Sequence, residues 1–170
     1  MADRLAILGA GPIGILHVQL ALSRGATDVT VLERQAALAQ LAEDYGAHHI
    51  VRELDDLSEE AYDVVIDATG ALPVMSRTIA LARKGGTVLL FGVPTRGTQL
   101  ELDAFAIFEK GLTIRSSYTS LRNSYQAVDL LQSGVVDVSD LISHRLTITQ
   151  FERGVKLIEE GLEDVKKVLI

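Results

Sequence analysis

Leu5-Ala6-Ile7-Leu8-Gly9-Ala10-Gly11-Pro12-Ile13-Gly14 is the stretch that decides the fold of this chain. A short apolar run ends in a glycine turn, and after Pro12 the apolar residues recur at helical spacing, which predicts a strand, a tight turn and a helix. Gly9 permits the tight turn, Gly11 leaves no side chain where a phosphate has to approach the backbone, and Gly14 lets the helix lie close to the strand.

Pro12 and Ile13 open the expected helix. The missing N–H of Pro12 costs nothing at the first helical position. The remaining free N–H groups of the first turn, together with the positive end of the helix dipole, point toward an anion. The stretch therefore predicts a nucleotide site at the front of the chain.

Composition narrows the class of protein. The chain has 170 residues, of which 48% are hydrophobic and 23% are charged, as expected for one globular domain with a real core. The net charge of −7, without a basic run, argues against a nucleic-acid partner. The absence of cysteine excludes disulfides, thiolate zinc sites and cysteine nucleophiles within these residues. No signal-peptide pattern and no apolar stretch of about 18 residues is present, so we expect a cytoplasmic protein without a membrane partner.

Strands and helices are expected to alternate along the first two thirds of the chain. This alternation predicts right-handed βαβ units, and hence an α/β fold of the Rossmann type: a doubly wound, six-stranded parallel sheet with strand order 3-2-1-4-5-6. A further segment from Gln99 to Leu102 alternates like an edge strand. The expected strands are residues 5–8, 28–32, 49–51, 62–67, 87–91 and 112–115, and the expected helices are 13–23, 35–45, 73–82, 104–110 and 123–131.

The end of the chain is expected to be an addition to this domain. We expect a nucleotide-binding domain over residues 1–140 and a helix–strand appendix over 141–170. The run Thr149-Gln150-Phe151-Glu152 predicts a capping box at the start of a helix, and residues 167–170 predict a closing strand. The apolar stripe on that helix is either core or a partner surface; it consists of Phe151, Val155, Ile158 and Leu162.

Glu33 and Arg34 suggest which nucleotide is bound. Glu33 follows the second expected strand, about 20 residues after the glycine turn, where a carboxylate can accept hydrogen bonds from both hydroxyl groups of a ribose. A 2′-phosphate would meet a like charge there, so Glu33 favours NAD over NADP. Arg34 keeps NADP open as the less favoured alternative, because some sites accept that phosphate with an arginine beside the ribose.

Other polar residues have a structural interpretation beside the functional one. Asp67 either caps the helix that follows it or contacts the ligand. His17 falls on the apolar side of the first helix and is interpreted as a packed core residue. His48, His49 and His144 lack a partner at ligand spacing, so we expect no metal site.

Several catalytic motifs are missing from the chain. The Tyr-x-x-x-Lys pair of short-chain dehydrogenases, the P-loop and the Gly-x-Ser-x-Gly nucleophile elbow do not occur. A methyltransferase that binds S-adenosylmethionine also uses a glycine loop and an acid after the second strand, but the Gly9–Gly14 spacing and the Gly-Gly-Thr-Val strand argue against it. The sequence thus holds a cofactor site and no recognisable catalytic residue.

The whole chain resembles the cofactor-binding half of zinc-dependent medium-chain alcohol dehydrogenases, in the branch of sorbitol, other polyol and threonine dehydrogenases. Residues 8–14, 63–70, 84–94 and 151–170 carry the resemblance. It implies hydride transfer between an alcohol and NAD. The zinc, its ligands and most of the substrate pocket would lie in a preceding domain that this sequence lacks, and residues 141–170 would return to that domain.

The resemblance also implies roles for single residues. Gly92, Val93 and Pro94 would lie along the nicotinamide, Ala68 and Thr69 near the adenosine, and Ser116 and Ser117 near the nicotinamide carboxamide. The family pairs two such domains edge to edge near the segment from Gln99 to Leu102, which implies a homodimer. We expect a truncated domain that binds NAD without oxidising alcohols, the non-enzymatic alternative being a free-standing nucleotide-sensing module that uses the Phe151 stripe on a partner.

Overall fold

The computed structural model describes residues 3–119, 122–161 and 165–170. Its contacts divide the chain into two compact units, Met1–Arg122 and Asn123–Ile170. The two units meet at residues 122 and 123, whereas the sequence predicts a boundary between residues 140 and 141. The boundary between residues 140 and 141 remains a prediction. Each unit is described by itself.

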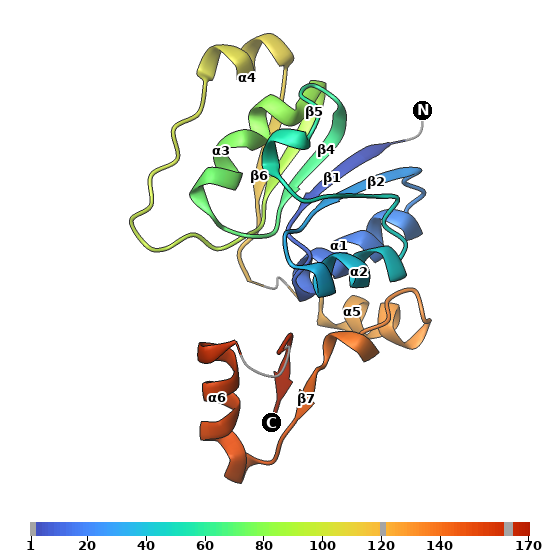
Figure 1. The fold of residues 1–170 in the computed structure, drawn as a ribbon. Helices are drawn as coiled ribbons and strands as arrows, with labels where there is room; N and C mark the ends of the chain where they lie inside the picture. The colour runs from blue at the N-terminus through green and yellow to red at the C-terminus, as the bar shows by residue number, and fades with distance from the viewer. Residues whose placement is uncertain (1–2, 120–121, 162–164) are drawn as a thin grey trace. The chain divides into compact units, whose positions relative to one another are not determined.

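A parallel sheet forms the centre of the first unit (Figure 1). Its order is β3-β2-β1-β4-β5-β6 and every neighbouring pair is parallel, so the predicted Rossmann topology is confirmed. The strands are β1 (Arg4–Leu8), β2 (Asp28–Leu32), β3 (His49–Val51), β4 (Tyr62–Asp67), β5 (Ala82–Leu90) and β6 (Thr113–Ser116).

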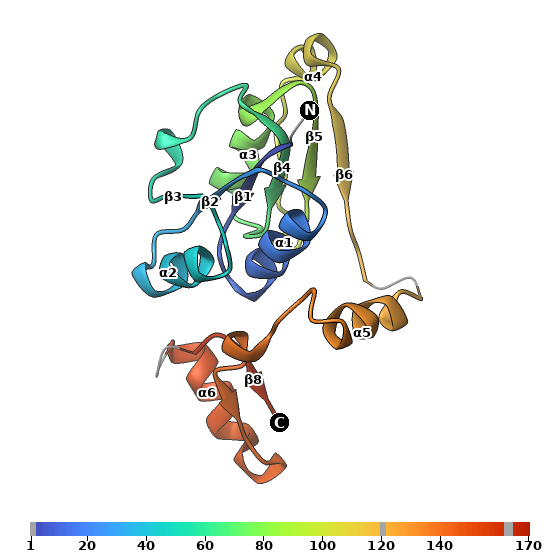
Figure 2. The same ribbon diagram turned by 90° about the vertical axis from the view of Figure 1, so that its right-hand side faces the viewer.

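Helices cover both faces of this sheet. Helices α1 (Pro12–Ser23) and α2 (Ala36–Asp44) lie on one face and α3 (Leu72–Leu81) lies on the other (Figures 1 and 2). Strand residues such as Ile7 and Val65 therefore have no exposed surface. This two-sided burial explains why the strands read as uninterrupted apolar runs.

Helix α4 (Ala104–Lys110) begins and ends as its sequence predicts. The Asp103 side chain accepts a hydrogen bond from the Ala106 N–H at 3.0 Å, and Gly111 closes the helix in the left-handed conformation with φ 60°. Between the two, Phe105 and Phe108 are 69% and 81% exposed, so α4 presents an apolar surface to solvent.

Lys110 is a buried cation whose role the sequence did not indicate. Its Nζ donates to the carbonyl oxygens of Ile79, Ala80 and Ala82 at 3.1, 3.2 and 3.2 Å, and it pairs with Glu60 at 3.3 Å. These carbonyls belong to the end of α3, where a helix leaves acceptors without partners. Lys110 therefore caps α3 from a neighbouring helix.

The predicted edge strand from Gln99 to Leu102 is wrong. These residues form no strand in the described part of the chain, because β6 is the outer strand on that side of the sheet and nothing described pairs with residues 99–102. Strand β5 also begins earlier than expected. Ala82 already pairs with Tyr62, and the register shifts before the pairing of Val64 with Thr87.

The second unit combines helices with a two-stranded parallel sheet. That sheet joins β7 (His144–Arg145) to β8 (Val168–Leu169), which confirms a closing strand within residues 167–170. Helix α5 (Ser124–Gln132) precedes it, and α6 (Phe151–Glu160) lies between its two strands in the chain. Gly154 allows α6 to approach this sheet, because a Cβ there would lie 3.3 Å from the side chains of Leu146 and Val168.

One expectation for α6 needs revision, and the described structure favours one of the two alternatives for its apolar stripe. The capping box uses Thr147 and Gln150 rather than Thr149 and Glu152, since the Thr147 N–H donates to Gln150 Oε1 at 3.1 Å and a 3-10 turn precedes the α-helix. The predicted stripe is exposed in the described structure: Phe151, Val155 and Ile158 are 54%, 36% and 60% exposed, while its last member, Leu162, lies outside the described residues.

Candidate functional site

The carboxyl ends of five strands lie in register at one edge of the sheet. Leu8 pairs with both Leu32 and Asp67, Asp67 pairs with Leu90, and Leu90 pairs with Ser116. The loops that follow these strands therefore share one rim, where doubly wound sheets bind ligands. All but one of the predicted site residues lie in these loops or the helical turn after them; Ser116 ends β6.

The three glycines of the first loop serve different purposes. Gly9 has φ 103°, and a Cβ there would lie 2.8 Å from Thr69 Cγ2. A Cβ on Gly14 would lie 1.9 Å from the Gly9 carbonyl oxygen. Gly11 has an ordinary φ of −61°, and apart from its neighbours in the chain no described atom lies within 4 Å of the position its Cβ would take. The fold therefore requires Gly9 and Gly14, whereas Gly11 keeps space open beside the backbone.

Helix α1 begins at this open space. Pro12 occupies the first turn, and its N-cap Gly11 supplies no side-chain hydrogen bond to the N–H groups of that turn. Ile13 is 41% exposed there. A helix start of this kind suits a phosphate group, because the backbone N–H groups and the helix dipole both favour an anion.

Glu33 is held against the glycine turn. Its Oε2 accepts a hydrogen bond from the Ala10 N–H at 3.0 Å, and its Oε1 accepts one from the Gln35 N–H at 2.9 Å. A carboxylate oxygen can accept more than one hydrogen bond. The Glu33 carboxylate is thus fixed at the end of β2 and can still accept from a ligand hydroxyl.

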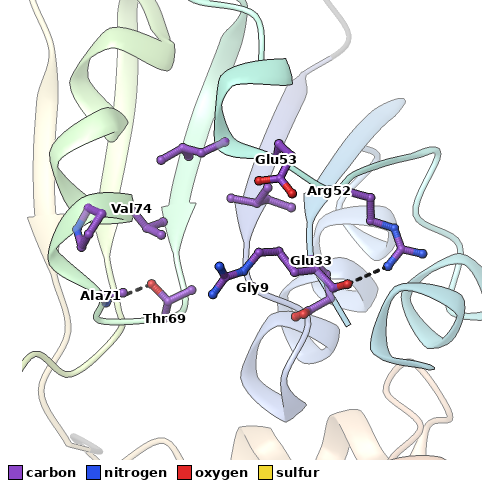
Figure 3. A pocket seen from close by; sticks show the side chains of 11 residues that line it. Gly9, Glu33, Arg52, Glu53, Thr69, Ala71 and Val74 are labelled. Atoms are coloured by element: carbon purple, nitrogen blue, oxygen red, sulfur yellow. Dashed lines mark hydrogen bonds between the residues drawn. The ribbon is translucent and has the colours of Figure 1, made fainter. Parts of the chain in front are cut away.

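A cavity of about 370 Å³ opens beside Glu33 between the ends of β1, β2 and β4 (Figure 3). It brings together four of the predicted residues from three loops. Its lining consists of Gly9, Leu32, Glu33, Arg34, Arg52, Glu53, Leu54, Thr69, Ala71, Pro73 and Val74.

Arg52 and Glu53 belong to this cavity and were missed from the sequence. Arg52 donates to the Arg34 carbonyl oxygen at 3.1 Å, so two arginines line the same space (Figure 3). A usable signal was present, because Val51 pairs with Leu32 and the residues after it must emerge at the same rim. This signal was overlooked because the third strand is only 3 residues long and is weakly marked in the sequence.

Asp67 takes a third role beside the two considered from sequence. Its carboxylate is 0% exposed and accepts from the N–H groups of Thr69 and Gly70 at 3.0 and 3.1 Å and from the Thr69 hydroxyl at 2.6 Å. The N-cap of α3 is Ala71. Asp67 therefore shapes the turn after β4 instead of capping the helix or facing a ligand.

The remaining predicted residues lie on the rim beyond the cavity. The Ala68 N–H donates to the Leu8 carbonyl oxygen at 2.9 Å, which fixes the start of the turn after β4. The Gly92 N–H donates to the Asp67 carbonyl oxygen at 2.8 Å, and beyond it Val93 is 88% exposed and Pro94 partly exposed. Ser116 and Ser117 are exposed at the end of β6. None of these residues lines the cavity beside Glu33.

The histidines have structural surroundings. The rings of His17 and Phe91 form a T-shaped contact with centroids 4.8 Å apart, and burial lowers the pKa of the His17 imidazole below the ordinary 6.5. His48 Nδ1 accepts from the Val29 N–H at 3.0 Å, and His49 lies 3.6 Å from Asp28. Across residues 3–119, 122–161 and 165–170, no cluster of three or more His, Cys, Asp or Glu residues could hold a metal ion. The helices within these ranges are also too short or too polar to cross a membrane.

Comparisons with known proteins agree with this arrangement. D-altritol 5-dehydrogenase of Agrobacterium fabrum is 34% identical over 146 residues, which cover 85% of this chain and 44% of that enzyme. A protein of Sinorhizobium meliloti 1021 described as a zinc-binding dehydrogenase, solved with NADP, matches with TM-score 0.86 and 31% identity over 91% of this chain and 48% of its own. An Escherichia coli CFT073 alcohol dehydrogenase, solved with NADH, has the same fold with TM-score 0.87 and 22% identity, over 98% and 51% of the two chains.

The chain spans about half the length of the relatives it matches. The family model for zinc-binding dehydrogenases matches residues 12–133, which include the glycine turn from Pro12 onward and all the later loops of the rim. This chain is a member of the zinc-binding dehydrogenase family and comprises its nucleotide-binding region.

Proposed function

We propose that this chain binds NAD as the cofactor half of an alcohol or polyol dehydrogenase. The observation that carries the proposal is the open position at Gly11, next to a helix start and a fixed carboxylate. Neither the φ angle nor the packing of the chain requires glycine there. A pyrophosphate that approaches the backbone does require it.

Different loops of the rim bind different parts of the dinucleotide. The first turn of α1 binds the pyrophosphate, with Gly11 admitting it and Pro12 and Ile13 at the helix start. Glu33 accepts hydrogen bonds from the adenosine ribose, and the cavity beside it, which Thr69 lines, holds the adenosine. Ala68 precedes Thr69 in the same turn and lies near the adenosine without lining the cavity. When bound, NAD supplies a nicotinamide C4 that accepts a hydride from an alcohol carbon.

The loops farther along the rim serve the nicotinamide end. Gly92, Val93 and Pro94 lie along the ring, and Ser116 and Ser117 face its carboxamide. These residues orient the ring and have no side chain suited to proton transfer from an alcohol. The zinc, the alcohol site and the proton relay are assigned to the part of the relatives that this sequence does not match, so we expect these 170 residues to bind cofactor without catalysis.

NAD is preferred to NADP in this proposal. Glu33 would repel a 2′-phosphate and accepts hydrogen bonds from a free ribose. Two features favour the opposite choice: Arg34 and Arg52 both line the cavity, and the Sinorhizobium meliloti relative was solved with NADP. The negative charge of Glu33 supports NAD in this proposal, since two backbone N–H groups already hold the carboxylate in place.

A second copy of the chain is the proposed partner. β6 is the last strand of the sheet, no described strand pairs with its outer side, and α4, which follows residues 99–102, exposes Phe105 and Phe108. An unpaired strand edge next to an apolar helix surface is suited to pairing with the same edge of another copy.

Calorimetric titration of the chain with NAD, NADP and S-adenosylmethionine tests the function. We expect saturable binding of NAD, weaker binding of NADP and no heat from S-adenosylmethionine. Binding of S-adenosylmethionine alone would overturn the proposal in favour of a methyltransferase. Oxidation of a polyol by the chain supplied with zinc and NAD would contradict the assignment of catalysis to other residues.

A further inference from the structure

The Thr69 hydroxyl makes two hydrogen bonds within its own turn. It donates to Asp67 Oδ1 at 2.6 Å and accepts from the Ala71 N–H at 3.0 Å. Asp67 itself is fully buried, and its carboxylate also accepts from the backbone of Thr69 and Gly70. Thr69 thus links a buried carboxylate to the first residue before α3, and its hydroxyl proton is committed before any ligand arrives.

The same turn supports the loop after β5. The Asp67 carbonyl oxygen accepts from the N–H groups of Phe91 and Gly92 at 3.0 and 2.8 Å. Gly70 and Gly92 touch through their backbones, because a Cβ on Gly92 would lie 2.0 Å from the Gly70 nitrogen. A Cβ on Gly70 would lie 2.5 Å from the Val93 carbonyl oxygen. A shift of Gly70 would therefore displace the loop that carries Val93.

The other side of the turn faces the cavity. Thr69 and Ala71 line it together with Pro73 and Val74, and Figure 3 shows the hydrogen bond between Thr69 and Ala71 at that wall. One short turn is thus both the wall of the adenosine cavity and the support of the loop beyond it.

We propose that Thr69 is a positioning residue that fixes the distance between the two ends of the bound dinucleotide. With Asp67, it holds the wall of the adenosine cavity and the Gly92–Val93 backbone in a fixed relative position. When the adenosine binds in the cavity, the residues that bind the nicotinamide are therefore already at the right distance. This inference rests on the proposed function and adds that the Thr69 hydroxyl acts through the protein instead of bonding the cofactor.

Thr69→Val and Thr69→Ser form a matched pair for the test. Valine has nearly the shape of threonine but removes both hydrogen bonds of the hydroxyl, whereas serine keeps them. Residue 69 is exposed, so both variants are expected to fold, which thermal unfolding checks. The probes are AMP, which occupies only the adenosine end, and NADH, which spans both ends.

For Thr69→Val we expect NADH affinity to fall about tenfold, the effect of a lost charge-assisted hydrogen bond, and AMP affinity to fall by a clearly smaller factor, about threefold at most. Thr69→Ser should restore both affinities. A direct contact with adenosine would instead weaken AMP and NADH by the same factor, which would overturn the positioning role and leave the proposed function intact. A purely structural role would lower the unfolding temperature without changing the ratio of the two affinities, and this also overturns it.

Amide hydrogen exchange gives a readout without any ligand. In Thr69→Val the N–H groups of Phe91 and Gly92 should exchange at least about tenfold faster than in Thr69→Ser, because their acceptor belongs to the loosened turn. Equal exchange in the two variants contradicts the mechanical link. If the unchanged chain binds neither AMP nor NADH, the proposed function fails and the positioning role fails with it.

Discussion

The Glu33 carboxylate accepts a hydrogen bond from the Ala10 backbone N–H at 3.0 Å, which ties the end of β2 to the glycine turn after β1. The second carboxylate oxygen accepts from Gln35 at 2.9 Å at the start of α2. Two loops and a helix start therefore fix the charge of Glu33 before a ligand binds. Such an acceptor loses little conformational entropy when it bonds a ribose.

Replacing Glu33 tests the choice between cofactors. In Glu33→Gln the negative charge is lost and an NH2 group takes the place of one acceptor oxygen, so NADH affinity should fall about tenfold. NADPH should keep its affinity or gain, because the repulsion of the 2′-phosphate disappears. Fluorescence titration with both reduced cofactors measures the ratio, and an equal loss for both would contradict the role of Glu33 in preferring NAD.

Alanine substitutions test the proposal that Gly11 serves the ligand whereas Gly14 serves the fold. Gly11→Ala should cost less than about 1 kcal/mol of stability, as expected for Gly to Ala at an N-cap, yet abolish measurable NADH binding. Gly14→Ala should lower the free energy of unfolding by several times as much, since its Cβ would lie 1.9 Å from the Gly9 oxygen. Urea unfolding and NADH titration measure the two effects. NADH binding by Gly11→Ala at unchanged affinity would remove the main support for the site.

Acidification should destabilise the fold through His17. Burial lowers the pKa of His17 in the folded chain below the ordinary 6.5, so between these two values the unfolded chain binds the extra proton. The contribution of His17 to stability is therefore complete above pH 6.5 and falls as the pH drops toward the folded-state pKa, by at most about 1.4 kcal/mol per pH unit. His17→Gln should lack this component. Urea unfolding at pH 7.5 and 5.5 compares the two proteins, and identical pH slopes would disprove it.

Removing the buried cation of Lys110 should destabilise the first unit. Lys110→Met keeps the aliphatic stem but leaves the carbonyl oxygens of Ile79, Ala80 and Ala82 without their donor, at a cost of about 3 kcal/mol. Lys84→Met is the control, since Lys84 is exposed and should change stability by less than about 0.5 kcal/mol. Equal unfolding midpoints for the two variants would show that the cap contributes little.

Sedimentation tests the proposed second copy. The unchanged chain should form a species of twice its 18.4 kDa mass at micromolar concentration. Phe108→Asp should shift the equilibrium toward the monomer without loss of NADH binding, because Phe108 is 81% exposed on α4. A monomer at every concentration for the unchanged chain would rule out the dimer.

The centre of the sheet could be predicted from sequence because its inner strands are buried on both faces. Residues such as Val65 and Val88 therefore had to be apolar, and glycines mark the ends of several of the helices. The alternating residues from Gln99 to Leu102 led to the wrong prediction of an edge strand. Alternation indicates that one face of a segment is exposed, but a strand also needs a neighbouring strand to pair with. Thr147 was passed over as a cap because Thr149 and Glu152 fit the same motif equally well.

The candidate site was predictable where local geometry demands a residue type. Gly9 and Glu33 were found by their spacing from the first strand, and both line the cavity. Arg52 was not found, because the third strand is short and its carboxyl end was not recognised as part of the same rim, where Arg52 lies beside Arg34. The role of Asp67 likewise depends on hydrogen bonds to a turn that follows it and on the loop after a different strand, which no linear motif encodes.

The open space at Gly11 offers a place to attach a reporter. The chain contains no cysteine, so Gly11→Cys would introduce a single thiol at a backbone position that no described side chain crowds. A thiol-reactive fluorophore or spin label could then be attached at the N-terminus of α1, since no other thiol is present to react. Since a side chain at residue 11 fills the space reserved for the pyrophosphate, the labelled chain would report the mobility of the turn without ligand and would serve as a non-binding control.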